Sequence, residues 1–151
     1  MKKARVEVAV PKFTRVVSFA RNDMRDLEAL TLGEYGLPEK PNFPTVDSIA
    51  GLKKPFCNPK NNNTCLVGFQ MTVSTEGHDL NLGGGRLIRQ KFKDLFKLSK
   101  VNLANMYIVF VTTKQAELSF KTKQTWKTSE GTVATEMNAV RQFVLVMHDA
   151  L

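Results

Sequence analysis

Four side chains in this sequence are of the types that perform nucleophilic or general acid–base chemistry. They are the thiols of Cys57 and Cys65 and the imidazoles of His78 and His148. A cysteine enzyme needs its thiol within hydrogen-bond reach of a base, and no spacing in the sequence brings a cysteine and a histidine together. Two cysteines and two distant histidines also lack the spacing of a zinc site. We therefore expect no catalytic residue, no metal and no cofactor, and a small enzyme acting on an anionic substrate is the third of three functional hypotheses.

The N-terminal residues, MKKARVEVAV, alternate instead of forming the apolar run of a secretion signal. No stretch reaches the roughly 20 consecutive apolar residues that a membrane-spanning helix requires. Cys57 and Cys65 are separated by seven residues, NPKNNNT, and are expected as reduced thiols because disulfides are rare in proteins that are not secreted. The expected location is the cytoplasm, the nucleus or a virion.

Gly83, Gly84 and Gly85 form the one run that resembles a phosphate-binding turn, because glycine lets backbone amides approach an anion at the start of a helix. The run lacks the spacing of a P-loop and that of a dinucleotide-binding turn. Two interpretations are open. The run is either a flexible hinge or tight turn, which we favour, or an anion-binding turn.

Positive charge is concentrated between residues 86 and 127, which contain ten basic and two acidic residues, a net charge of +8. The rest of the chain has twelve residues of each sign and nets zero. Such segregation of charge predicts a positive field directed at an anionic partner, whereas an even distribution would indicate solubility alone. The other interpretation is a solvated lysine surface without a partner.

Two predicted elements position these charges. Residues 86–100 (RLIRQKFKDLFKLSK) have the spacing of an amphipathic helix whose basic stripe is separate from its apolar positions. Residues 117–127 alternate as a strand, which would align their lysines in a row on one face. The predicted anion-binding residues are those of the helix stripe and the lysine row: Arg86, Arg89, Lys93, Lys97, Lys100, Lys121, Lys123 and Lys127.

Aromatic side chains near these charges are expected to pack inward. Phe92 and Phe96 lie on the apolar face of the predicted helix. Trp126 has the opposite parity to Lys123 and Lys127 on the predicted strand, so its ring points away from them. We therefore expect the basic groups to contact phosphates rather than to present aromatic rings to bases.

The remaining pattern predicts an α+β fold, a single domain over residues 1–151 with a largely antiparallel sheet of about six or seven strands and two helices. Strands are indicated at residues 5–10, 13–19, 65–75, 107–112, 117–127, 132–137 and 140–147, the last as a central strand. A first helix begins at Asn22 or Asp23 and holds Leu30 on its apolar face. Residues 37–64 contain five of the six prolines and are predicted to be a long ordered loop or an interaction arm.

The leading functional hypothesis is a non-enzymatic basic protein that binds nucleic acid, RNA or DNA, through its phosphates. If about six basic residues each contact a phosphate of a duplex, the logarithm of the binding constant falls against that of salt concentration with a slope of about −5. The second hypothesis is a self-assembling viral structural protein of matrix or capsid type, a homo-oligomer whose basic face meets the genome or an anionic membrane. The chain has no long arginine-rich N-terminal arm, which weakens the capsid version.

Overall fold

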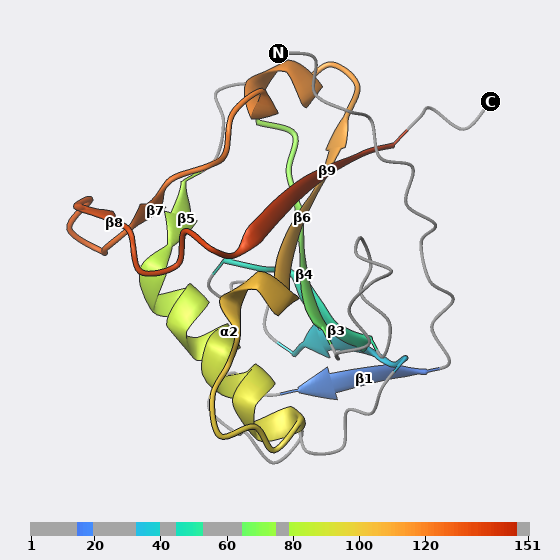
Figure 1. Cartoon of the computed structure of the whole chain (residues 1–151). Helices are drawn as coiled ribbons and strands as arrows, with labels where there is room; N and C mark the ends of the chain where they lie inside the picture. The colour runs from blue at the N-terminus through green and yellow to red at the C-terminus, as the bar shows by residue number, and fades with distance from the viewer. Residues whose placement is uncertain (1–14, 20–32, 40–44, 53–64, 75–78, 148–151) are drawn as a thin grey trace.

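A computed structural model of the chain describes residues 15–19, 33–39, 45–52, 65–74 and 79–147. Within these ranges the chain forms an α+β domain with nine strands in two sheets and one α-helix, where two helices were expected (Figure 1). The predicted strand at 5–10 and the predicted helix from residue 22 to 30 lie outside the described residues. The α+β class is confirmed.

The larger sheet has six strands, and their order across the sheet follows their order in the chain. They are β1 (Val16–Phe19), β2 (Tyr35–Pro38), β3 (Ser48–Leu52), β4 (Cys65–Met71), β6 (Met106–Thr113) and β9 (Arg141–Met147). β2 and β3 pair in antiparallel fashion, as do β3 and β4. The pairs β1–β2, β4–β6 and β6–β9 are parallel. The expectation of a largely antiparallel sheet is therefore wrong.

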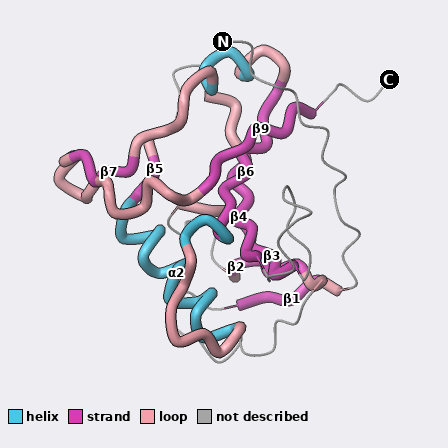
Figure 2. Tube along the Cα trace, in the orientation of Figure 1, coloured by secondary structure: helices cyan, strands magenta, loops and turns pink. Residues whose placement is uncertain are grey.

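The connections explain the parallel pairs. Antiparallel neighbours need only a tight turn, whereas parallel neighbours need a crossover that returns the chain to the same edge of the sheet. The helix α2 (Leu82–Leu95) lies in the crossover from β4 to β6. The crossover from β6 to β9 holds the 3-10 helix η2 (Glu117–Phe120) and two short strands. Figure 2 shows how both crossovers run alongside the larger sheet.

β6 is a deeply buried strand, with seven of its eight residues buried. Met106, Ile108 and Phe110 belong to the core that contains α2, whereas the alternate residues Tyr107 and Val109 belong to a second core on the other face. This confirms the predicted buried strand at 107–112. Its continuous apolar run is typical of a strand that is covered on both faces.

The smaller sheet joins β5 (Leu80–Asn81), β7 (Trp126–Lys127) and β8 (Val133–Ala134). The side chain of Trp126 is 1% exposed, which confirms that its ring packs in the core. The predicted strand at 117–127 is wrong, because it begins as η2 and only β7, at its end, is extended. A local hydrogen bond from Ser119 Oγ to the carbonyl of Ala116 (2.7 Å) favours the tight helical turn over the ladder that alternation predicted.

Two further expectations need correction. Residues 37–64 are not a loop throughout, because β3 lies within this range and pairs with both β2 and β4; residues 40–44 and 53–64 lie outside the described part. Residues 140–147 were predicted as a central strand, but β9 comes last in the strand order and its side chains are half-buried or exposed. The apolar composition of β9 therefore does not reflect cover on both faces.

α2 confirms the predicted basic helix, and local contacts explain its start and its orientation. The side chain of Asn81 caps the first turn by accepting a hydrogen bond from the backbone N–H of Gly84 (2.8 Å). Ile88 and Phe92, each 1% exposed, pack into the core. The ring of Phe96 meets that of Phe92 edge to face, with 5.0 Å between the ring centroids. Both phenylalanines therefore pack inward, as predicted.

The glycine run belongs to the first turn of α2 and is not a hinge. A Cβ on Gly85 would lie 2.5 Å from Cζ3 of Trp126 and 3.2 Å from Cε of Met137, so the absence of a side chain allows the helix to approach the indole. The N–H of Gly84 already donates to the Asn81 cap and is not available to an anion. Close packing of helix and indole accounts for Gly85.

We expect Gly85→Ala to lower the free energy of unfolding by about 1–3 kcal/mol, because the added methyl group overlaps the Trp126 ring and the core has to shift. Gly83→Ala is the matched control, since its Cβ would meet only the side-chain oxygen of Asn81, at 3.2 Å. Urea unfolding followed by the fluorescence of Trp126 measures both variants. An unchanged midpoint for Gly85→Ala would contradict the packing of α2 on the indole.

Candidate polyanion-binding surface

Glu136, which lies outside the basic segment, pairs with two of the predicted anion-binding residues. Arg86 Nε donates to Glu136 Oε1 at 3.0 Å, and Arg86 Nη2 donates to the same oxygen. Arg89 Nη1 lies 3.7 Å from Glu136 Oε2. The hydrogen bond from Arg86 holds the pKa of the Glu136 carboxyl below its ordinary value and raises the pKa of Arg86. The N-terminal half of the basic stripe is therefore partly neutralised within the fold.

Two lysines of the predicted row are also engaged within the fold. The Lys127 ammonium lies 2.7 Å from Asp79 Oδ2, and the Lys123 ammonium donates to the backbone carbonyl of Asn138. Burial lowers the pKa of Lys123, because the cation loses part of its hydration. Lys121 directly follows η2 and is exposed. The predicted row of lysines on one strand face is therefore wrong.

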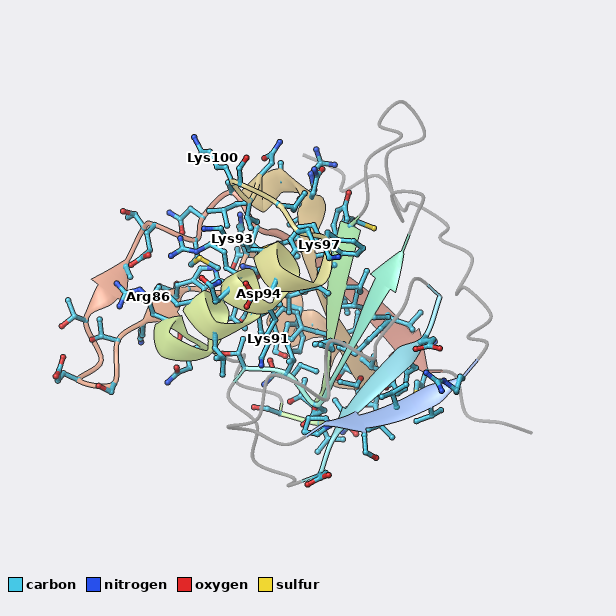
Figure 3. All side chains as sticks on the ribbon, turned by 90° about the horizontal axis from the view of Figure 1, so that it is seen from below. Arg86, Lys91, Lys93, Asp94, Lys97 and Lys100 are labelled. Carbon is cyan, nitrogen blue, oxygen red and sulfur yellow. The ribbon has the colours of Figure 1, made fainter. Side chains whose placement is uncertain are left out.

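Three predicted residues lie at the C-terminal end of α2 and in the turn that follows it: Lys93, Lys97 and Lys100, named the lysine cluster. Lys97 and Lys100 are exposed, and Lys93 is half-buried. Figure 3 shows all three on one side of α2 and the buried Lys91 on the other. In the part of the chain that the structure describes, none of the three ammonium groups has an acidic partner. The neighbouring acid, Asp94, accepts a hydrogen bond from Gln90 (2.8 Å).

The way in which α2 ends builds this cluster. Lys97 follows the C-cap Phe96, and Figure 3 shows it on the same side of α2 as Lys93. The backbone N–H of Leu98 donates to the carbonyl of Lys93 (2.9 Å), and that of Lys97 donates to the carbonyl of Asp94 (3.3 Å). Cations are favourable here because the last carbonyls of a helix carry partial negative charge. The helix end therefore holds several cations, none of which is paired with an acidic side chain of a described residue.

Lys114 and Lys121 are also exposed and have no acidic partner among the described residues, but they belong to another region. Lys100 precedes β6 and Lys114 follows it directly. The eight residues of this strand span roughly 25 Å. Among the described residues, Lys114 therefore lies at the far end of β6 from the turn that holds the lysine cluster, so the described basic residues do not form the single surface expected from the sequence.

The acids that neutralise the basic segment were missed by the sequence reasoning. Arg86 and Glu136 are 50 residues apart in the chain. A count of charges along consecutive residues cannot reveal an ion pair between residues that are this far apart in the chain. Glu136 and Asp79 were therefore counted with the neutral remainder, although each lies against a basic side chain.

The structure does not test the hypothesis of a catalytic site formed by a cysteine and a histidine, which stays a prediction. Cys65 is fully buried in β4, and Cys57, His78 and His148 lie outside the described residues. Among the residues that the structure describes, no group of three or more His, Cys, Asp and Glu side chains could hold a metal ion.

The Arg86–Glu136 pair makes a prediction about acid stability. A carboxyl whose pKa is lowered by folding stabilises the protein above its ordinary pKa of 4.5, and this contribution is lost as the pH falls through the lowered value. We expect Glu136→Gln to remove this dependence, so that the wild type loses more of its stability than the variant below about pH 4.5. Glu130→Gln, which changes another exposed glutamate, is the control. Urea midpoints that decline in parallel for the wild type and Glu136→Gln would contradict the pair.

None of the described helices combines the length and the apolar character that crossing a membrane requires. No protein-family model, no curated protein and no solved structure matches this chain.

Proposed function

We propose that this chain binds nucleic acid through its phosphates, and that the contact is made by the lysine cluster at the C-terminal end of α2. The observation that supports the proposal is the placement of Lys93, Lys97 and Lys100 on one side of a packed helix, without an acidic partner in the described structure. Cations held by a rigid element produce a local positive field that attracts a polyanion.

Contacts to phosphates are favoured over contacts to bases. Stacking on bases requires exposed aromatic rings, and Trp126 and Tyr107 are 1% and 2% exposed. None of the exposed large apolar side chains in the described part is aromatic. Binding by lysines alone positions a nucleic acid without reading its sequence. We therefore expect similar affinity for duplexes of different sequence.

Nucleic acid is also favoured over an anionic membrane. A helix that lies on a membrane inserts its apolar face between the lipid headgroups, but the apolar face of α2 is used in the core, where Ile88 and Phe92 are each 1% exposed. The exposed large apolar side chains of the described part lie on other elements than α2 and the turn after it. Among the described side chains, the lysine cluster therefore has no exposed large apolar side chain beside it.

The internal ion pairs reduce the expected salt dependence. With Arg86, Arg89 and Lys127 next to carboxylates, three contacts from the lysine cluster predict a slope of about −3 in place of the −5 expected for six contacts. A measured slope near −3 supports a contact limited to the cluster. A slope close to zero is the result that would contradict binding through phosphates.

Two double variants with the same change of charge test where binding takes place. We expect Lys97→Gln/Lys100→Gln to weaken binding to a labelled duplex of about 20 base pairs by on the order of sixtyfold in 0.1 M salt, since two phosphate contacts are lost. Lys114→Gln/Lys121→Gln is the matched control, because both residues are exposed but lie outside the lysine cluster. Fluorescence anisotropy measures both affinities. Equal losses would show that net charge, and not the cluster, determines binding.

A second candidate function, self-assembly, is favoured by β9. This strand comes last in the order of the larger sheet, and its described neighbour is β6. Residues 142–147 of β9 (QFVLVM) carry no charge and no proline, and Val144 and Met147 are exposed. Natural proteins usually protect an edge strand with charge, proline or a cover. An uncharged edge of this kind favours pairing with a second copy of the chain.

If β9 pairs between copies, the wild type is larger than a monomer at high protein concentration in light scattering. We expect Val144→Lys to shift it to the monomer, because a charge placed on each copy disfavours edge pairing. Val133→Lys is the control, since Val133 is exposed on β8, in the smaller sheet. A wild type that stays monomeric in low and high salt contradicts assembly through β9.

A further inference from the structure

Lys97 has a backbone conformation that is unfavourable for lysine. Its φ angle is +51°, in the left-handed region, and the other described non-glycine residue with a positive φ is Thr45, at +78°. Gly33 and Gly131 also have positive φ, of +86° and +85°, and a glycine is the residue usually found at such positions. Lys97 stands one residue after the C-cap Phe96, where helices often end in glycine.

The side chain of Thr45 explains why that residue is held in its unfavourable conformation. Thr45 is buried, and its Oγ1 donates a hydrogen bond to the backbone carbonyl of Asn81 (2.8 Å), next to the start of α2. A glycine could not make this bond. The strained backbone of Thr45 therefore has a compensating interaction inside the fold.

The side chain of Lys97 has no such compensation in the described structure. It is exposed, and its ammonium group makes no hydrogen bond or ion pair with a described residue. The favourable charge at the end of the helix is already supplied by Lys93, in the last turn. The hydrogen bonds that end the helix use the backbone of Lys97, which a glycine would supply equally well.

We propose that Lys97 is the principal phosphate-contacting residue of the lysine cluster, held in a left-handed conformation at a cost in stability because its ammonium group is needed by the ligand. Strained backbone is often found at binding sites, where the ligand and not the fold uses the side chain. The ligand is the sugar–phosphate backbone of a nucleic acid. This inference rests on the proposed function, and it assigns to Lys97 a larger contribution to phosphate binding than to the other lysines of the cluster.

Lys97→Gly tests the inference because it should raise the stability of the fold and lower the affinity for nucleic acid. We expect the folding equilibrium constant to rise on the order of fivefold, since the left-handed strain is removed. We expect duplex affinity in 0.1 M salt to fall about eightfold and the salt slope to become shallower by about 1, since one phosphate contact is lost. Urea unfolding measures the first quantity, and anisotropy titrations with the labelled duplex measure the second.

Two further variants separate strain from charge. Lys97→Ala removes the charge but keeps the strain, so it should weaken binding like Lys97→Gly without the gain in stability. Lys114→Ala removes one exposed charge outside the lysine cluster and should leave binding at the wild-type level. A Lys97→Gly variant that is no more stable than Lys97→Ala overturns the role of strain.

The failure of this inference differs from the failure of the proposed function. If Lys97→Gly binds as tightly as the wild type while Lys97→Gln/Lys100→Gln binds weakly, the special role of Lys97 is overturned and the cluster stands. If the wild type itself does not bind the duplex, the proposed function fails. Vesicles of anionic and neutral lipid serve as the second probe, and a Lys97-dependent preference for anionic vesicles over the duplex would overturn nucleic acid as the ligand.

Discussion

The packing of one face of α2 determines which charges this protein presents. Ile88 and Phe92 are buried in the same core as Ile108 and Phe110 of β6, and the start of the helix lies against Trp126 because Gly85 has no side chain. These contacts fix the rotation of the helix about its own axis. The lysine cluster faces away from the core for this reason and needs no contact of its own to hold its position. The placement of the lysine cluster thus depends on the packing of the apolar residues of the helix.

The elements that could be predicted are those in which the apolar positions of the sequence are also the buried positions of the structure. The basic helix and the buried strand at 107–112 both satisfy this condition. The strand at 117–127 does not, because Leu118 is exposed, Phe120 reaches the core from a 3-10 turn and Trp126 reaches it from a two-residue strand. The direction of strand pairing was not predictable from the strands themselves, since it depends on the path of the crossovers between them.

The candidate surface was predictable to a smaller extent than the fold. Periodicity found the helix stripe, and the lysine cluster lies within it. Charge counting, however, treats Arg86 and Lys97 alike, although one hydrogen-bonds to a glutamate from a distant part of the chain and the other has no acidic partner in the described structure. The field that a polyanion meets comes from cations that the fold leaves uncompensated. The formal charge of a segment therefore overestimates the positive charge available to a polyanion whenever side chains of that segment form ion pairs with distant parts of the chain.

The order of strands in the larger sheet has a consequence for the synthesis of the chain. Because β1, β2, β3, β4, β6 and β9 lie across the sheet in chain order, each strand that leaves the ribosome can add to an edge that is already present. Until β9 emerges, that edge is β6, a strand whose residues are nearly all buried in the finished fold. An uncovered apolar edge is a template for other chains. Aggregation of the nascent protein is therefore most probable in the interval between translation of β6 and translation of β9, when a ribosome-associated chaperone would be most effective.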